Sequence, residues 1–494
     1  MKFQSTRDLK KIKYDSALVI KQGLADDGGL FVPEQIPTIS HEEIKSFCHF
    51  TYPELAATIL GKFLSDYSYD ELLHDCSAAY HSDVFREGAC HLAKVDDNTY
   101  SLELWHGPTC AFKDMALQIM PKLLSRALVK TGETRTSLVL VATSGDTGKA
   151  ALEGYKDVDQ IKICVFYPKN GVSTVQKLQM ITQSGSNVNV CAVEGNFDDI
   201  QTGVKHIFND SAIAEKLNKE GYFLSSANSI NFGRLAPQVV YYFKAYCDLL
   251  LHREIELGDE INVCVPTGNF GNILAAYIAK LMGLPIKKLI CASNSNNILT
   301  DFLNTGVYDR NRDFHLTMSP SMDILISSNL ERLLYLVGGV NETTKYMELL
   351  NSKGCYKVSD EIKQKIDKDF VGYFANESQT ANTVAKYYNL EDYLMDTHTA
   401  VAFFALESYR NEYHDNTKTI VASTASPYKF AKDVYNAIYH DNSYNDLEIL
   451  DELSITTGTK IPHPLHELNK KSINFSNVVK PDQMFDEVLN FIKK

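Results

Sequence analysis

The chain has 494 residues and a formal net charge of −13, with 44% hydrophobic and 22% charged residues. This composition is typical of a globular protein of roughly two to four domains, and the acidic balance argues against nonspecific binding to nucleic acid. An anionic ligand therefore needs a locally positive site, built from helix N-termini or from individual cations.

The ten cysteines show no C-x-x-C pair and no regular spacing, so we expect no disulfide framework. Several lie in apolar strand-like runs, whereas Cys110 precedes Lys113 by three residues and is a candidate site-lining residue. The N-terminus lacks the apolar core of a signal peptide, and no apolar run approaches the ~18 residues of a membrane span. These features predict a cytoplasmic protein with no membrane partner, no nucleic-acid partner and no metal site.

In chain order, residues 1–90 form the first predicted unit, a small N-terminal domain or lid. A turn-rich stretch at residues 23–33 precedes helical patterns near residues 42–50 and 52–65. The apolar content of this unit argues against a mere surface extension.

From about residue 95 the pattern becomes strand, turn and helix, repeated. Near-continuous apolar strands alternate with helical patterns, which predicts an α/β protein with parallel sheets covered on both faces. The predicted strands lie at residues 100–105, 137–142, 161–167, 188–193, 261–265, 288–292 and 419–422. Beyond residue 340 we expect helical covering or a subdomain. Ligands in such folds bind beyond the carboxyl ends of the strands.

A loop at residues 106–114 joins the first of these strands to a helical pattern, and it places Lys113 at the strand-to-helix junction. A lysine at such a position can form a Schiff base with a carbonyl cofactor if its surroundings lower its pKa. A solvated lysine in the first turn of a helix fits the local pattern as well.

Residues 266–272 follow a buried strand and open a helix. Their glycines let backbone N–H groups converge, and the helix N-terminus adds partial positive charge, which together predict a phosphate cradle. The stretch lacks the Gly-Lys-Ser/Thr of a P-loop and the third glycine of the dinucleotide fingerprint. A glycine-rich turn without a ligand fits the spacing equally.

Three other strand-to-helix loops carry hydroxyl groups or a cation. Residues 143–148 suit a carboxylate or phosphate, while Ala150 lacks the hydroxyl with which a P-loop binds magnesium. Arg234, after a polar stretch at residues 225–233, can bind phosphate bidentately or stand exposed at a helix start. Residues 423–430 offer a hydroxyl to a ring nitrogen or to a helix N-cap.

A lysine, a separate phosphate cradle and further anion-binding loops make one consistent set. Pyridoxal 5'-phosphate needs both an aldehyde partner and a phosphate site, and it acts on amino acids whose carboxylate must be held. The set predicts this cofactor and makes Lys113 the candidate catalytic residue.

The chain closely resembles the threonine synthase family, in its longer type found in many bacteria and fungi. Seven short motifs carry the resemblance along nearly the whole chain, at residues 27–33, 106–114, 143–148, 229–234, 268–272, 322–329 and 423–430. The resemblance implies fold type II of the pyridoxal-phosphate enzymes, a tryptophan synthase beta-like architecture with two parallel-sheet α/β domains around a cleft. We expect an N-terminal domain at residues 1–90, a large domain from residues 91–125 and 240–494, and a small domain at residues 126–239.

The same resemblance assigns roles to particular residues. It gives the covalent bond with the cofactor to Lys113 and a hydrogen bond with the pyridine nitrogen to Thr424, whose hydroxyl would not hold that nitrogen protonated. The cofactor phosphate is assigned to Gly268, Asn269, Phe270, Gly271 and Asn272. The substrate side is assigned to Thr143, Ser144, Asp146, Thr147, Asn231 and Arg234.

Asp146 departs from the family pattern, because many fold-type-II enzymes carry an asparagine there that bonds the phenolic oxygen of the cofactor. An ionised Asp146 would repel a phenolate, so either a proton is shared or the side chain points to the substrate.

The implied reaction converts O-phospho-L-homoserine and water to L-threonine and phosphate, with Lys113 moving protons at Cα and Cβ and Arg234 holding the phosphate. The alternatives are a phospho-lyase that releases a 2-oxo acid and ammonia, a serine/threonine dehydratase, and a non-catalytic relative that binds the cofactor. For the assembly we expect a monomer or a small homo-oligomer.

Overall fold

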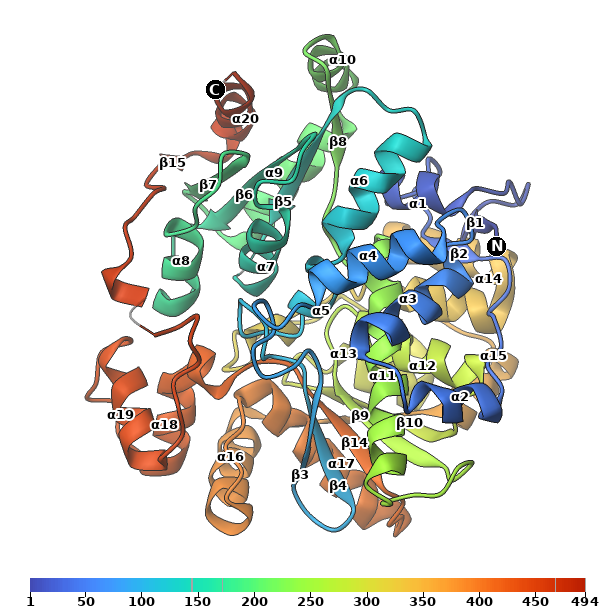
Figure 1. Ribbon diagram of the computed structural model, residues 1–494, viewed down its shortest axis with the longest axis vertical. Coiled ribbons are helices and arrows are strands. Elements are labelled where there is room, and N and C mark those ends of the chain that lie inside the picture. The colour runs from blue at the N-terminus through green and yellow to red at the C-terminus, as the bar shows by residue number, and fades with distance from the viewer. Residues whose placement is uncertain (144, 171, 467, 494) are drawn as a thin grey trace.

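Two sheets built mainly of parallel strands, each packed against helices, dominate the structure (Figure 1), a computed structural model that describes residues 1–494 except residues 144, 171, 467 and 494. This architecture confirms the predicted α/β class. Two further sheets have two strands each.

The larger sheet has six strands, in the spatial order β13 (Phe370–Phe374), β10 (Ile286–Ser293), β9 (Ile261–Pro266), β14 (Thr419–Ser423), β4 (Thr99–Glu103) and β3 (His91–Lys94). Neighbouring strands are parallel except β3 and β4. Successive residues of β9 face two different hydrophobic cores, since Val263 packs in one and Cys264 in the other. Burial on both faces explains the continuous apolar runs in the sequence.

The smaller sheet is parallel throughout, in the order β15 (Val478–Val479), β7 (Val188–Val193), β6 (Ile161–Pro168), β5 (Thr136–Ala142) and β8 (Tyr222–Ser225). The helices that follow its strands are α7 (Asp146–Tyr155), α8 (Thr174–Ile181), α9 (Phe197–Asn209) and α10 (Ser211–Lys219). The strand-to-helix junctions after β5 and β6 therefore lie at one edge of this sheet.

The C-terminal segment joins the smaller sheet, although we expected all of residues 240–494 in the large domain. Strand β15 pairs with β7, and helix α20 (Met484–Ile492) packs into the core of the small sheet through Val488 and Ile492. Helix α11 (Phe232–Leu251) also crosses the expected boundary at residue 239. The other domain boundaries stay a prediction.

The N-terminal segment packs onto the rest of the chain. It contains the antiparallel strands β1 (Phe3–Ser5) and β2 (Phe31–Pro33) and the helices α1 (Ser16–Gln22), α2 (His41–Phe47), α3 (Tyr52–Phe63) and α4 (Tyr69–Ala79). Capping boxes fix the starts of α2, α3 and α4. The ring of Phe3 lies 4.8 Å from that of Phe232 at the start of α11, edge to face.

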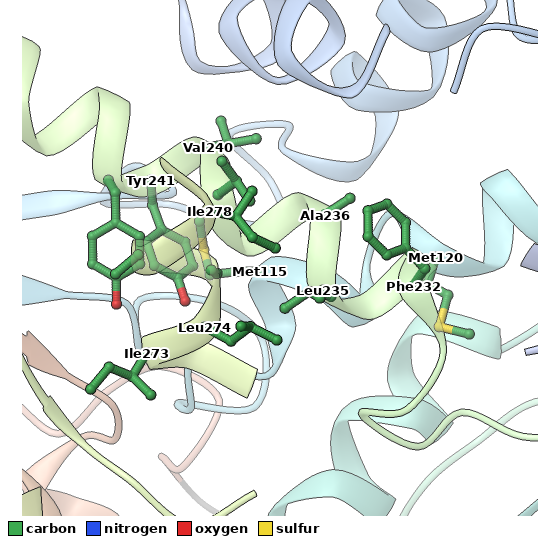
Figure 2. Close-up of a cluster of buried hydrophobic side chains, with 14 of the residues drawn as sticks. Met115, Met120, Phe232, Leu235, Ala236, Val240, Tyr241, Ile273, Leu274 and Ile278 are labelled. Carbon is green, nitrogen blue, oxygen red and sulfur yellow. The ribbon is translucent and has the colours of Figure 1, made fainter. Parts of the chain in front are cut away.

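Helix α11 and helix α12 (Gly271–Met282) share one hydrophobic cluster, which Figure 2 shows at close range. Val240 and Tyr241 of α11 belong to it, together with Leu274 and Ile278 of α12. Arg234 lies in the first turn of α11 and the predicted phosphate cradle leads into α12, so this packing holds those two sites in fixed relation.

The helical pattern after Lys113 forms two helices, α5 (Asp114–Leu117) and α6 (Met120–Lys130). Pro121, at the start of α6, has no N–H to continue the first helix. Helix α5 approaches α7 very closely at Gly154, where a Cβ would lie 1.9 Å from the Leu117 carbonyl oxygen. A glycine at this position lets the Lys113 loop contact the helix that starts at Asp146.

The remaining helices are α13 (Ile298–Thr305), α14 (Leu330–Lys353), α15 (Asp360–Asp369), α16 (Glu377–Glu391), α17 (Thr397–Tyr413), α18 (Ala431–Tyr439) and α19 (Glu448–Thr457). Short 3-10 turns lie at Pro320–Met322, Pro427–Phe430, Leu468–Lys470 and Pro481–Gln483, and strands β11 (Val307–Asp309) and β12 (Cys355–Lys357) form the last sheet. Within the described part of the chain, no helix combines the length and the apolar character needed to cross a membrane.

Candidate active site

Lys113 lies at the end of the loop that follows β4, as the N-cap residue of α5, and its side chain is 11% exposed. Its Nζ lies 3.3 Å from Asp146 Oδ2. Burial lowers the pKa of Lys113, with Lys429 and Arg234 acting in the same direction and Asp146 opposing them. The amine is therefore neutral more often than a solvated lysine, which suits a nucleophile.

Hydrogen bonds within the Lys113 loop and to the loop at Thr424 fix its conformation. Asp114 accepts hydrogen bonds from the backbone N–H and the hydroxyl of Thr109, both at 2.8 Å. The Phe112 N–H donates to the Thr424 carbonyl at 2.8 Å, so the predicted ring-nitrogen loop lies directly beside the Lys113 loop. Cys110 is buried in this loop, and burial raises the pKa of its thiol to about 12, which makes it a packing residue rather than a reactive thiolate.

Asp146 begins α7 and sits between two lysines. Lys429 Nζ lies 2.6 Å from its Oδ1, and Lys113 approaches its Oδ2. Gln176 donates to Oδ1 at 2.9 Å, and Ser321 Oγ lies 3.5 Å from Oδ2. Burial alone would raise the pKa of Asp146, but the two lysines hold it well below its usual range. The two lysines therefore favour an ionised Asp146, and its role toward the cofactor stays a prediction.

Sequence reasoning missed the role of Lys429. This side chain is fully buried in the turn after β14 and also donates to the Thr109 carbonyl at 2.9 Å. The only sequence signal was a lysine in a loop beyond the carboxyl end of a buried strand, and that pattern does not tell whether the side chain points inward.

The predicted phosphate cradle lies between β9 and α12. Two of its carbonyls are held from outside, because Ser327 Oγ donates to the Gly268 carbonyl at 2.7 Å and Asn329 donates to the Asn269 carbonyl. Phe270 has a φ of +60°, a left-handed conformation that costs a bulky residue roughly 1–2 kcal/mol. The cradle is thus a strained turn that its surroundings hold in place.

Side-chain amides lie close to this turn, two of them already donating to the Asn269 and Arg234 carbonyls. A Cβ on Gly271 would lie 3.6 Å from Asn329 Nδ2 and 3.8 Å from Gln238 Nε2. Asn272 uses its Oδ1 to accept from Tyr241 and Tyr242, at 2.7 Å and 2.5 Å, and its buried Nδ2 finds no partner within the described chain. Amide donors and a helix N-terminus facing one space are the groups that bind a phosphate.

Arg234 is buried at the start of α11, and it is the most informative of the predicted substrate residues. Its Nη1 donates to the Ala227 carbonyl at 2.8 Å, while its buried Nε has no hydrogen-bond partner among the described residues. None of the described carboxylates forms an ion pair with it, and burial lowers its pKa to about 10. A buried cation without a counter-ion is costly unless an anionic ligand supplies one.

The other predicted substrate residues differ in how many of their polar side-chain atoms already form hydrogen bonds within the protein. Asn231 caps α11 through its Oδ1 and donates from Nδ2 to the Ile20 carbonyl at 2.9 Å, so both polar atoms are engaged. The Thr143 hydroxyl accepts from the N–H groups of Gly145 and Gly148, each at 3.0 Å. Thr147 is half-buried on α7, and Ser144 lies outside the described residues.

Three protein-family models match the chain. They are described as threonine synthase N terminus over residues 2–80, pyridoxal-phosphate dependent enzyme over residues 94–424, and threonine synthase, C-terminal, over residues 399–492. Together they span nearly all of the sequence.

Curated proteins of similar length to this chain match it, and so do longer ones. The chain is 38% identical to threonine synthase of Pseudomonas aeruginosa, over 88% of this chain and 90% of that protein, and 35% identical to threonine synthase of Saccharomyces cerevisiae, over 91% and 92%. It is 40% identical to human Threonine synthase-like 1 over 92% of its own length, but spans only 62% of that protein.

Solved structures agree with these relatives. Pyridoxal-phosphate-bound threonine synthase from Brucella melitensis superposes with a TM-score of 0.87 at 34% identity, covering 100% of this chain and 99% of that one. Threonine synthase from yeast gives a TM-score of 0.89 at 31% identity with the same coverage. The fold type II architecture expected from the sequence is confirmed.

Proposed function

Because the chain belongs to the threonine synthase family of pyridoxal-phosphate-dependent enzymes, we propose that it converts O-phospho-L-homoserine and water to L-threonine and phosphate. The observation that carries this proposal is Arg234, a buried guanidinium that forms an ion pair with none of the described carboxylates and whose charge lowers the pKa of the Lys113 amine. A substrate that places its amino end at Lys113 and its phosphate at Arg234 supplies the missing negative charge.

Pyridoxal 5'-phosphate is the cofactor, and the residues of the site fit it. Lys113 offers a buried amine for the aldehyde, and the buried Asn272 Nδ2, at the start of α12, has no hydrogen-bond partner among the described residues and so remains free to donate to a phosphate. When bound, the cofactor supplies an electron sink for the negative charge that develops on substrate carbons. In this proposal the Thr424 hydroxyl bonds the pyridine nitrogen, which is supported by the backbone of Thr424 lying beside the Lys113 loop.

In this proposal Lys113 carries protons at the substrate Cα and Cβ. Its lowered pKa lets it accept a proton as a free amine, and the Asp146 carboxylate 3.3 Å away stabilises the ammonium that results. Lys429 supports this role indirectly, because it keeps Asp146 ionised. Asp146, which stands where the family pattern has an asparagine, thus becomes a charged partner for Lys113.

Arg234 has two tasks in the same proposal. It binds the substrate phosphate in the ground state, and it stabilises the additional charge on that group as the Cγ–O bond breaks. A proton then goes to Cγ, which becomes the methyl carbon, and water adds at Cβ, so that its oxygen becomes the threonine hydroxyl. The Lys113 side chain is mostly shielded from solvent, which limits competing proton exchange.

A phospho-lyase is the second candidate, because the chain is also 40% identical to human Threonine synthase-like 1, whose name does not state an activity. Both reactions use Lys113 for proton transfer and Arg234 for the leaving phosphate. They differ after phosphate loss, since the lyase releases a 2-oxo acid and ammonia instead of adding water at Cβ. A cytoplasmic location and a monomer or small homo-oligomer stay predictions.

The test is to incubate the purified holoenzyme with O-phospho-L-homoserine and quantify threonine, phosphate, ammonia and 2-oxo acid. We expect threonine and phosphate in equal amounts. Lys113→Ala is expected to lose both the visible absorbance of the bound cofactor and turnover. Ammonia and a 2-oxo acid as main products would establish the lyase, and full activity of Lys113→Ala would refute the assignment of that residue.

A further inference from the structure

Three distant segments of the chain meet at one buried guanidinium, that of Arg332 in the first turn of α14. Its Nε donates to the Phe31 carbonyl at 3.0 Å, its Nη1 to Asn329 Oδ1 at 2.5 Å, and its Nη2 to the Ile230 carbonyl at 2.5 Å. The side chain is completely buried. A planar fork with three donor nitrogens can hold three acceptors at once, whereas a lysine offers a single nitrogen.

Each acceptor belongs to a different functional segment. Phe31 lies on β2 of the N-terminal segment, and Ile230 lies directly before the cap residue of α11, the helix that carries Arg234. Asn329 precedes α14 and contacts the phosphate cradle. Arg332 therefore connects the N-terminal segment, the substrate-side helix and the cofactor-side loop.

The contact with Asn329 determines which way the amide of that residue faces. Because Oδ1 accepts from Arg332, Nδ2 is turned to the Asn269 carbonyl, to which it donates at 3.0 Å. The Asn329 backbone N–H donates to the same carbonyl at 3.1 Å. Two donors on one carbonyl fix the plane of the peptide that joins Asn269 to Phe270.

The orientation of this peptide bears on ligand binding. In a trans peptide the C=O and N–H point in opposite directions, so holding the Asn269 carbonyl outward turns the Phe270 N–H toward the other side of the turn. Ser327 Oγ holds the Gly268 carbonyl in the same way and so orients the Asn269 N–H. The same hydrogen bonds help to stabilise the left-handed conformation of Phe270.

We propose that Arg332 is a positioning residue for the phosphate of the cofactor: through Asn329 it holds the loop at residues 268–270 with its N–H groups facing the phosphate. This inference rests on the proposed assignment of that loop to the cofactor phosphate. None of the described acidic side chains forms an ion pair with Arg332, and Glu331 beside it is engaged by Arg7 and Thr6. The positive charge of Arg332 thus remains available to the loop.

The test compares pyridoxal 5'-phosphate with pyridoxal, which lacks the phosphate, in titrations of apoprotein prepared from the holoenzyme. Wild type is expected to bind the phosphorylated form far more tightly. Arg332→Met is expected to lose about tenfold or more of the affinity for pyridoxal phosphate while its affinity for pyridoxal stays within about twofold of wild type. A general loss of structure would weaken both ligands alike.

Two more variants complete the design. Asn329→Ala is expected to show the same selective loss, and the double variant no additional one, because both residues act through the Asn269 carbonyl. Arg410→Met is the matched control, since it removes an arginine that donates to Thr99 Oγ1 and to the Asn98 carbonyl and leaves Asn329 and Glu331 untouched. Its ratio of affinities is expected to equal that of wild type. If Arg332→Met does not fold, Arg332→Lys and Asn329→Ala carry the test.

The outcomes separate the inference from the assignment beneath it. Suppose that wild type binds pyridoxal phosphate more tightly than pyridoxal. If the Arg332 and Asn329 variants then show the same ratio of the two affinities, whether or not both affinities have fallen, Arg332 has no positioning role. If wild type itself does not discriminate, the assignment of the cradle to the cofactor phosphate is wrong.

Discussion

Replacing Lys429 with methionine tests the charge arrangement around Asp146 most sharply. The substitution keeps the length and apolar stem of the side chain but removes the cation 2.6 Å from Asp146 Oδ1. Both side chains are almost completely buried, at 0% and 3% exposure. Removing one partner of a buried pair costs about 3–5 kcal/mol, and we expect the lower end because Lys113 remains beside the carboxylate.

The pH dependence of this loss follows from the pKa of Asp146. In wild type the folded-state pKa lies below the unfolded value of about 3.9, so the contribution of Asp146 to stability is complete above about pH 4 and is lost as the pH falls further. We predict that without Lys429 the burial of Asp146 outweighs Lys113 and Gln176 and raises the folded-state pKa above the unfolded one, so the variant loses stability as the pH rises toward that raised value. The difference between variant and wild type should therefore be larger near pH 7 than near pH 5.

The assay is urea unfolding of both proteins at the two pH values, with Lys432→Met as the control. Lys432 lies on α18 and forms a half-exposed pair with Asp446 at 3.6 Å, so its removal should change the free energy of unfolding by about 0.5 kcal/mol or less. Adding Asp146→Asn to Lys429→Met should recover part of the loss, because the unpaired charge disappears. A loss that is equal at both pH values and is not relieved by Asp146→Asn would refute the reasoning.

Two further substitutions probe the anion site and the packing behind it. Arg234→Met should lower kcat/KM for the phosphorylated substrate about tenfold to a hundredfold, which corresponds to the loss of a hydrogen bond to a charged group. Steady-state kinetics would check this, with Arg234→Lys as the variant that keeps the charge. Unchanged kinetics would contradict the phosphate role. Gly154→Ala should destabilise the protein by about 1–3 kcal/mol and weaken cofactor binding, because the added Cβ would collide with the Leu117 carbonyl and push α5 away from α7. A thermal shift assay and a cofactor titration measure these two effects, and results that both match wild type would contradict the close approach of the two helices.

Local patterns were sufficient for the parts of the site that a single strand-loop-helix unit forms. Lys113 and the turn at residues 268–272 each follow a buried strand and begin a helix, and the structure places them at those junctions. The continuous apolar strands reflect burial on both faces, so the class of sheet was predictable as well.

Pairings between distant segments could not be predicted in this way. Lys429 and Asp146 lie far apart in the sequence, and neither position indicates that the two side chains meet in the interior. Strand β15 has only two residues, too few for a period, yet its pairing with β7 brings the C-terminal segment to the smaller sheet. Arg332 sits in a helix whose local pattern gives no reason for an arginine to be buried, since all three acceptors come from other segments or from the residue before the helix.

The most direct test of the proposed reaction is to determine which product carries the oxygen of the water. The holoenzyme is incubated with O-phospho-L-homoserine in oxygen-18 water, and threonine and phosphate are analysed by mass spectrometry. Elimination of phosphate with addition of water at Cβ predicts label in the threonine hydroxyl, none in the phosphate at early times, and one threonine per phosphate. Label in the phosphate, or phosphate released with a 2-oxo acid and no threonine, would contradict the proposed function.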